Sequence, residues 1–335
     1  MKNVIVVGGA GTLGKYVVKE FKESGYEVTI FDKNNPDSRE SDFFKDVNFY
    51  KGSIANIDDC KRIIKNADIV VHVAALIYGI SDYPPEMMFN VNTTGTFNVF
   101  QAACESGVKR IIFASSGTVY GFDLKLTPKD KLLPKYLPID EDSPLKISTA
   151  YALTKIIGER IAEFFNMQYG VTTVSLRIFH LRIPIRIDSK NGTKQDLSKV
   201  EIYRSINKYQ ENLKKTGMML WPLESQPIGE GRSQVWTGYI LAYNDVRDAA
   251  LSFRLSAESK YLEGKNEIFN ISNMDDNGTR FETRELIKKY EYESIPQKKE
   301  LKVREPLYNC DKAKKILGYQ SRYNWWELFG KQLFE

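Results

Sequence analysis

Short, mainly apolar runs alternate with amphipathic stretches through the first half of the chain. The apolar runs lie at residues 4–7, 28–31, 47–50, 69–73, 111–114 and 174–178. The stretches that repeat apolar residues at helical spacing lie at residues 12–24, 58–66, 97–106 and 151–169. A short strand that is apolar along its whole length must be covered on both faces, and strands that alternate with helices form parallel sheets. The pattern therefore predicts an α/β fold with a doubly wound parallel sheet.

The first predicted strand leads directly into a glycine-rich run, Gly8-Gly9-Ala10-Gly11-Thr12-Leu13-Gly14. In this context Gly8 permits a tight turn, Gly11 lets a pyrophosphate approach the backbone, and Gly14 lets the helix pack close to the strand. The amino terminus of the helix adds free N–H groups and the positive end of the helix dipole. A glycine-rich turn without a ligand is the alternative. The position of the run favours the dinucleotide site of a Rossmann domain.

An acidic residue, Asp32, ends the second predicted strand. A carboxylate at this position can accept hydrogen bonds from ribose hydroxyls, and it repels a 2′-phosphate. Asp32 therefore predicts NAD rather than NADP, and the adjacent Lys33 weakens that preference.

Composition narrows the remaining classes of protein. The 335 residues carry 48 Lys and Arg against 43 Asp and Glu, a formal charge of +5, with the two signs interleaved. Interleaved charges favour a solvated surface over a nucleic-acid site. No apolar run reaches the ~18 residues of a membrane span and no signal-peptide layout is visible, so we expect a soluble, cytoplasmic protein. The cysteines, Cys60, Cys104 and Cys310, lack the spacing of disulfides or metal ligands, and no metal is expected.

A tyrosine and a lysine stand one helical turn apart in the run Tyr151-Ala152-Leu153-Thr154-Lys155. A nearby ammonium favours the phenolate form of a tyrosine, which could then take the proton of an alcohol. This spacing is common by chance, and a surface pair is the alternative. The hypothesis gains weight from Ser115 and Ser116, because they leave the fifth predicted strand at the carboxyl edge of the sheet, where ligands bind in such folds.

Taken together, these segments resemble the extended short-chain dehydrogenase/reductase family, in particular the NAD-dependent epimerase/dehydratase group that acts on sugars and nucleotide sugars. The matching segments are residues 7–14, 52–54, 72–75, 90–96, 115–121, 151–155, 158–159 and 176–177 and, more weakly, 244–249, 269–271 and 312–318. They follow one another in order over nearly the whole chain.

The resemblance implies a role for each matching residue. Tyr151 would be the general acid and base, Lys155 would hold the nicotinamide ribose and lower the pKa of Tyr151, and Ser116 would hydrogen-bond the reacting oxygen. Ser53 departs from the family, whose members usually carry Asp there. The implied cofactor-binding residues are Gly8, Gly11, Thr12, Leu13, Gly14, Asp32, Lys33, Ser53, Ile54, Ala74, Ala75, Asn92, Tyr151, Lys155 and Ile178. A homodimer is also implied, through a helix bundle that includes the helices at residues 97–106 and 151–169.

Three reactions are open to such a site: net oxidation, epimerisation and dehydration. Dehydratases of the family carry an Asp-Glu pair where this chain has Gly117 and Thr118, so dehydration is disfavoured. Candidate substrate contacts are Ser116, Thr118, His180 and Arg232. His180 replaces the usual Asn and could equally be a structural histidine, and Arg232 is the nearest substitute for the diphosphate-binding arginine of epimerases.

The preferred interpretation is an NAD-dependent sugar epimerase that acts on a nucleotide sugar through a keto intermediate. The alternatives are a one-way dehydrogenase of a free sugar or sugar acid, and a non-catalytic relative that senses NAD or binds RNA. Residues 1–178 are expected to form the NAD-binding Rossmann domain. Residues 179–335 are expected to form mainly a smaller α/β substrate lobe, with segments around residues 236–272 returning to the first domain. The lysine-rich residues 122–138 are either a solvated loop or a basic flap over the substrate.

Overall fold

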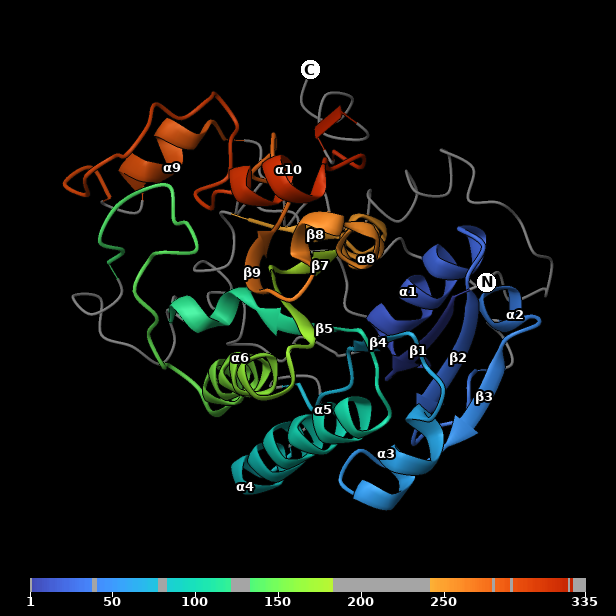
Figure 1. Ribbon diagram of the computed structural model, residues 1–335. Helices are drawn as coiled ribbons and strands as arrows, with labels where there is room; N and C mark the ends of the chain where they lie inside the picture. Colours follow the sequence, from blue (N-terminus) through green and yellow to red (C-terminus); the bar gives the residue numbers. More distant parts are fainter. Residues whose placement is uncertain are drawn as a thin grey trace.

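A seven-stranded parallel sheet forms the centre of the molecule (Figure 1). The computed structural model describes residues 2–37, 41–77, 83–121, 133–182, 242–278, 281–289, 292–324 and 326–327. The strands lie in the order β3-β2-β1-β4-β5-β6-β9. Their bounds are β1 Asn3–Val7, β2 Glu27–Asp32, β3 Asn48–Lys51, β4 Ile69–His72, β5 Arg110–Ser116, β6 Thr172–Ile178 and β9 Asn266–Ile271. The predicted doubly wound α/β sheet is confirmed.

Alternating side chains of the strands pack into two apolar cores, one on each face of the sheet. In β1, Val4 and Val6 belong to one core, whereas Ile5 and Val7 belong to the other. Helices α1, α8 and α10 cover the first face, and α3, α5 and α6 cover the second (Figure 1). Their bounds are α1 Thr12–Glu23, α3 Ile57–Ile64, α5 Gly95–Glu105, α6 Ala150–Tyr169, α8 Val246–Glu258 and α10 Asp311–Leu317. Burial on both faces is what the mainly apolar strands require. Strand β3, at the edge of the sheet, is the exception, since it is largely exposed.

Helix ends follow the local sequence. Helix α1 is followed by Gly25, whose φ of +82° is open to glycine at little cost. Helix α6 begins where Thr149 accepts a hydrogen bond from the Ala152 N–H at 3.0 Å, and it ends at Gly170, whose φ is +64°. These boundaries lie within one residue of those predicted for residues 12–24 and 151–169.

The segment before α5 differs from the prediction of a single helix at residues 97–106. A short helix, α4 (Pro85–Phe89), leads into a π-helix, η2 (Asn90–Thr94), which continues directly into α5. The π-helical turn holds one more residue than an α-helical turn would, and such turns recur at functional sites. Its sequence, Asn-Val-Asn-Thr-Thr, has no apolar period, so the helical pattern could not reveal it.

Part of the second half of the chain returns to the sheet. Strand β9 pairs in parallel with β6, from Thr173 opposite Asn266 to Ile178 opposite Ile271. β9 is not among the strands predicted from apolar runs because it begins with Asn266 and Glu267. Between β6 and β9 in the sequence, β7 (Leu181–Arg182) and β8 (Asn244–Asp245) pair to form a separate two-stranded sheet. The domain division at residue 178 stays a prediction, since residues 183–241 lie outside the described ones.

A third apolar core lies beyond the carboxyl ends of the strands. It joins the turn η3 (Gly117–Tyr120) to Leu137, Ile139 and Phe179, and to residues around α9 (Thr283–Lys289). The described segments also include α2 (Ser41–Phe44) and η6 (Lys260–Leu262). None of the helices in the described segments combines the length and the apolar character of a membrane span.

Candidate active site

The glycine-rich turn between β1 and α1 is tightly packed at two of its three key positions. A Cβ atom on Gly8, whose φ is +87°, would lie 2.5 Å from the backbone nitrogen of Ala74. A Cβ on Gly14 would lie 2.0 Å from the carbonyl oxygen of Gly8. A Cβ on Gly11 would meet only that same oxygen, at 3.2 Å. Gly8 and Gly14 thus bring backbone segments together, and Gly11 leaves the helix terminus open to a ligand.

Asp32 connects the turns that follow β1 and β2. Its Oδ2 accepts a hydrogen bond from the Ala10 N–H at 3.1 Å, and its Oδ1 accepts one from the Asn34 N–H at 3.0 Å. A carboxylate has about four acceptor positions, so these two bonds leave room for ribose hydroxyls. The ammonium of Lys33 lies 5.9 Å from the centre of the Tyr83 ring. The carboxylate is therefore oriented by the backbone of the dinucleotide turn.

Ser53 and Ile54 lie after β3, beside a carboxylate that sequence reasoning missed. The Ser53 N–H donates to Oδ2 of Asp59 at 2.9 Å, and the Ser53 hydroxyl accepts from the Ala55 N–H at 3.3 Å. The hydrogen bond from Ser53, followed by the one from Arg62, lowers the pKa of Asp59. Relatives are expected to carry Asp at position 53, and here the nearby carboxylate comes from Asp59, six residues further along in α3. The six-residue separation from Ser53 gave no signal for this contact.

Asn92 joins the segment after β4 to helix α6. Its amide accepts from the Leu76 N–H at 2.8 Å and donates to the Leu76 carbonyl at 2.9 Å. The same amide nitrogen donates to Oγ1 of Thr154 at 3.2 Å. Ala74 and Ala75 directly precede Leu76, and the Ala74 N–H donates to the Val7 carbonyl at 2.9 Å. Asn92 thus orders the segment that carries both alanines.

Lys155 is buried with its ammonium against the end of β5. Its Nζ donates to the carbonyl oxygen of Ala114 at 2.6 Å and lies 4.8 Å from the centre of the Phe113 ring. The same Nζ lies 5.4 Å from the centre of the Tyr151 ring. Burial lowers the pKa of Lys155 to about 7, against the opposing effect of the Glu159 carboxylate. The lysine can therefore change its charge near neutral pH.

Tyr151, half-buried in the first turn of α6, is hydrogen-bonded to Ser116. Burial raises the pKa of Tyr151, and the hydrogen bond with Ser116 opposes that rise. The structure therefore brings together Ser116 from β5 with Tyr151 and Lys155 from α6. In the chain alone, the Tyr151 proton is held tightly, so base catalysis requires further stabilisation of the phenolate.

Ser116 begins the turn η3 as its N-terminal cap. Its Oγ accepts a hydrogen bond from the Thr118 N–H at 3.2 Å, and the Thr118 hydroxyl lies 3.0 Å from the same oxygen. Between them, Gly117 packs against an aromatic ring: a Cβ there would lie 2.3 Å from two ring carbons of Phe179. A larger residue at position 117 would require Phe179 to move.

A buried polar network lies behind the three candidate catalytic residues. Both Glu159 oxygens accept from Arg177, and Oε1 also accepts from the Ser115 hydroxyl at 2.6 Å. Arg177 donates in addition to the Tyr120 hydroxyl at 2.8 Å, which donates to Oδ1 of Asn270 at 2.7 Å. Sequence reasoning assigned these residues no role in the site. The only signals were a charged residue within an apolar strand and another within a buried helix face.

The remaining predicted residues are His180, Ile178, which is the register partner of Ser116 in β5, and Arg232. His180 is half-exposed in the turn between β6 and β7, where its carbonyl accepts from the Asn244 N–H at 2.8 Å. Ile178 is buried at the end of β6 and pairs with Ile271. Arg232 lies outside the described residues.

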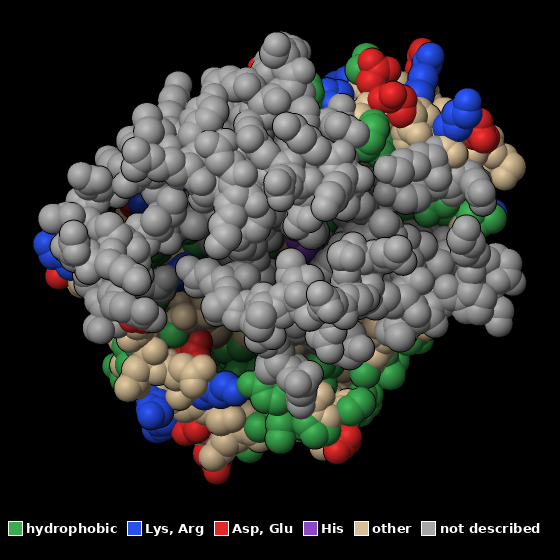
Figure 2. Space-filling model, turned by 180° about the vertical axis from the view of Figure 1, so that it is seen from behind, with side chains coloured by type: hydrophobic (Ala, Val, Ile, Leu, Met, Phe, Trp, Pro, Cys, Tyr) green, Lys and Arg blue, Asp and Glu red, His purple; other side chains and the backbone are tan. Residues whose placement is uncertain are grey.

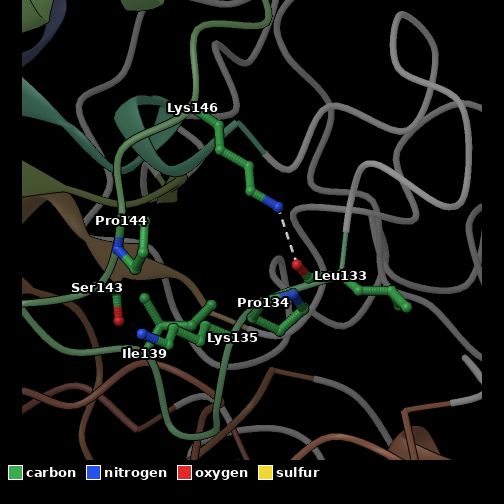
Figure 3. Close-up of a pocket in the computed structure, with 7 residues that line it drawn as sticks. All are labelled: Leu133, Pro134, Lys135, Ile139, Ser143, Pro144 and Lys146. Atoms are coloured by element: carbon green, nitrogen blue, oxygen red, sulfur yellow. Dashed lines mark hydrogen bonds between the residues drawn. The ribbon is translucent and has the colours of Figure 1, made fainter.

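Of the lysine-rich segment, residues 133–138 are described. They contribute to a cavity of about 90 Å³ that is lined by Leu133, Pro134, Lys135, Ile139, Ser143, Pro144 and Lys146 (Figure 3). The Lys146 side chain extends toward Leu133, and its ammonium donates to the Leu133 carbonyl at 2.9 Å (Figure 3). Whether the segment is a solvated loop or a flap stays open. On the described surface in Figure 2, basic and acidic side chains are interspersed, in keeping with the interleaved charges of the sequence.

Comparison with solved structures supports the fold over nearly the whole chain. UDP-glucose 4-epimerase from Thermotoga maritima, with UDP-glucose, has a TM-score of 0.63 and 24% identity over 99% of both chains. UDP-glucose 4-epimerase from Brucella ovis, in complex with NAD, has a TM-score of 0.64 and 22% identity over 97% of this chain and 94% of the other.

Comparison of sequences reaches the family. UDP-glucose 4-epimerase from Bacillus subtilis is 33% identical over 167 residues, which are 47% of this chain and 46% of the relative. The chain spans about half the length of the curated relatives it matches. The model of the NAD dependent epimerase/dehydratase family matches residues 4–216. With the glycine-rich turn, Asp32, and the Ser116, Tyr151 and Lys155 group in place, the chain belongs to the NAD dependent epimerase/dehydratase family.

Proposed function

We propose that this protein is an NAD-dependent epimerase of a nucleotide sugar, which inverts one carbinol centre by transient oxidation. The observation that carries the proposal is the meeting of Ser116, Tyr151 and Lys155 at the carboxyl end of β5, in the same sheet as the glycine-rich turn. The family membership and the epimerases among the relatives support it.

The residues present fit NAD as the cofactor. The close packing at Gly8 and Gly14 leaves the amino terminus of α1 open for a pyrophosphate, and Asp32 keeps acceptor positions for the ribose of an adenosine. Lys155, Ile178, Ala74 and Ala75 would line the nicotinamide side. When bound, NAD accepts a hydride from the sugar and returns it.

The chain's own residues then supply proton transfer and orientation. The proton of the sugar hydroxyl passes to the Tyr151 phenolate as the C–H hydride leaves, which gives a keto sugar. Tyr151 returns the proton to the same oxygen when the hydride is delivered to the opposite face of the ketone. Once Tyr151 holds the proton, Ser116 is free to donate to that oxygen. A protonated Lys155, together with the positive charge that bound NAD would supply, favours the phenolate.

Dehydration is the least compatible of the reactions in this family. It would need an acidic pair at positions 117 and 118, and the Phe179 ring fills the space of any side chain at position 117. The remaining alternatives are net oxidation of a free sugar or sugar acid and a non-catalytic role. Net oxidation would release NADH, and a non-catalytic protein would convert no sugar, whereas an epimerase interconverts sugars without net NADH.

The test begins with the nucleotide that the purified protein retains. After denaturation, mass spectrometry should find NAD, because an epimerase keeps its cofactor through a closed redox cycle. Incubation with UDP-glucose, UDP-galactose and their N-acetyl forms should then interconvert a pair without net NADH. Tyr151→Phe should abolish turnover and retain NAD. Steady NADH release with a free sugar would instead establish the dehydrogenase, and full activity of Tyr151→Phe would reject the role of Tyr151.

We also propose that the protein is a homodimer, with α5 and α6 in the interface. Figure 2 shows hydrophobic side chains gathered at the lower edge of the molecule, the edge along which Figure 1 draws α4 and α5. Phe97, Phe164 and Met167 are 39%, 46% and 75% exposed. Sedimentation should give a dimer that Phe164→Glu dissociates, whereas Val303→Glu, also at an exposed residue, leaves it intact. The cytoplasmic location likewise remains a proposal, which cell fractionation tests.

A further inference from the structure

The hydroxyl of Ser116 receives two hydrogen-bond donors from one residue. The Thr118 backbone N–H reaches Ser116 Oγ at 3.2 Å, and the Thr118 hydroxyl reaches it at 3.0 Å. Ser116 also shares a hydrogen bond with the phenol of Tyr151. Three hydroxyl groups, from Thr118, Ser116 and Tyr151, therefore lie in series, and the last is the group proposed to exchange a proton with the sugar.

Counting valences fixes the direction of these hydrogen bonds. A serine hydroxyl has one proton to donate and two lone pairs that accept. The Thr118 N–H can only donate, so it takes one lone pair. When Tyr151 is a phenolate, it can only accept, so Ser116 must give its proton to Tyr151. The remaining lone pair of Ser116 then accepts from the Thr118 hydroxyl, and every valence of Ser116 Oγ is used.

We propose that Thr118 is a positioning residue that directs the Ser116 proton toward the Tyr151 oxygen while Tyr151 is a phenolate. The inference rests on the proposed function, since it concerns the same site. A hydroxyl that accepts hydrogen bonds becomes a stronger donor, because hydrogen bonds in a chain polarise one another. Thr118 therefore strengthens the bond that Ser116 makes to negative charge on Tyr151. This role differs from the direct substrate contact expected for Thr118 from the sequence.

The surrounding packing holds Thr118 in this geometry. The turn η3 is held by the contact of Gly117 with Phe179 and by the full burial of its own residues Val119 and Tyr120. Thr118 itself is half-buried. A change of its side chain can therefore remove the hydroxyl while the backbone N–H stays in place.

The closing experiment separates the hydroxyl from the shape of the side chain. Thr118→Val removes the hydroxyl and keeps the branched shape, and Thr118→Ser restores a hydroxyl. We expect Thr118→Val to lower kcat about tenfold with KM little changed, the size of one lost hydrogen bond between neutral groups. The limb of the kcat profile that rises with pH should move to higher pH, because the phenolate is less stabilised. Thr118→Ser should recover most of both changes.

A double-mutant cycle with Ser116→Ala tests whether Thr118 acts through Ser116. In the Ser116→Ala background, Thr118→Val should have no further effect on kcat. A tenfold loss in that background as well, a rise in KM alone, or no recovery with Thr118→Ser would each overturn the proposal. Circular dichroism checks folding, and Thr118→Ala replaces Thr118→Val if the latter does not fold.

A second readout does not depend on sugar turnover. In the protein loaded with NAD, the ionisation of Tyr151 is followed by phenolate absorbance, as the difference from Tyr151→Phe. Thr118→Val should raise the pH of this ionisation relative to the unsubstituted protein. If no sugar is epimerised, the proposed function fails, but this titration still tests whether Thr118 stabilises the Tyr151 phenolate through Ser116. If epimerisation occurs but Thr118→Val and the unsubstituted protein ionise at the same pH, the role of Thr118 is rejected and the proposed function stands.

Discussion

Arg177 and Glu159 form an ion pair in which two parallel hydrogen bonds, of 2.9 and 2.8 Å, join the guanidinium to both carboxylate oxygens. Their side chains are only 3% and 4% exposed. The pair ties β6 to α6, and the Ser115 hydroxyl adds β5. The three elements that carry Ser116, Tyr151, Lys155 and Ile178 are therefore held to one another by a single carboxylate.

Breaking this pair should cost much of the protein's stability. Glu159→Gln leaves an unpaired guanidinium in the interior and should lower the free energy of unfolding by about 3–5 kcal/mol. The control is the exposed pair of Arg160 and Glu163, at 2.7 Å, where Glu163→Gln should cost less than about 1 kcal/mol. Urea denaturation measures both. Equal losses in the two variants would contradict the structural role of the buried pair.

The burial of Lys155 predicts a pH dependence of stability in the protein without cofactor. The pKa of Lys155 falls to about 7 on folding, so between pH 7 and the unfolded value near 10.4 the unfolded chain binds more protons. The free energy of unfolding should therefore gain a contribution as the pH rises from 7 to 10, and lose it on the way back. Lys155→Met should lack this contribution. Urea denaturation at pH 7 and 9.5 measures the free energy of unfolding of both proteins. Equal changes with pH in the two proteins would contradict the contribution of Lys155.

His72 should remain neutral well below the usual range of histidine. It is fully buried, and burial, followed by the charge of Lys155, lowers its pKa to about 3. Its Nε2 lies 3.0 Å from the Thr96 hydroxyl, which itself donates to the Asn92 carbonyl, so Nε2 carries the proton. The stability that neutral His72 contributes is complete above pH 6.5 and is lost as the pH falls toward 3.

Nuclear magnetic resonance can follow this histidine. With only two histidines in the chain, His72→Gln assigns the ring signals of both. The His72 signals should not shift between pH 5 and 8. A titration midpoint near 6.5 would show that the imidazole is accessible to water and would contradict the burial.

The contact between Gly117 and Phe179 predicts a substitution and its rescue. Gly117→Ala would place a methyl group 2.3 Å from the Phe179 ring and should lower the free energy of unfolding by about 1–3 kcal/mol. Phe179→Leu in the same protein should recover part of that loss, although Phe179→Leu alone is destabilising. Thermal unfolding of the single and double variants gives the coupling. Additive losses would mean that the alanine is accommodated in another way.

Local patterns predicted six of the seven strands of the sheet because each apolar run is itself a strand. The pattern failed where the local sequence is polar. Strand β9 starts with Asn266 and Glu267, and the π-helix runs from Asn90 to Thr94. Both are stabilised by partners far away in the sequence, such as β6 for β9.

In the candidate site too, local motifs could be predicted from the sequence and contacts between separate segments could not. The glycine-rich run and the Tyr151 and Lys155 pair were recognisable because their spacing within one turn or one helix reflects their geometry. The contact of Asp59 with Ser53, the pairing of Arg177 with Glu159 and the double donation from Thr118 depend on folding of separate segments or on a turn of irregular shape. Spacing alone carries no information on such contacts.

The π-helical turn also fixes a phase relation within the chain. One residue of an α-helix corresponds to about 100° of rotation, so the extra residue in this turn offsets α4 from α5 by that angle. Deleting a single residue between Asn90 and Thr94 would rotate one helix against the other, and the Asn92 amide would no longer face Leu76 and Thr154. The number of residues in the π-helical turn thus sets which side chains of α4 and α5 face the site, and it matters as much as their identity.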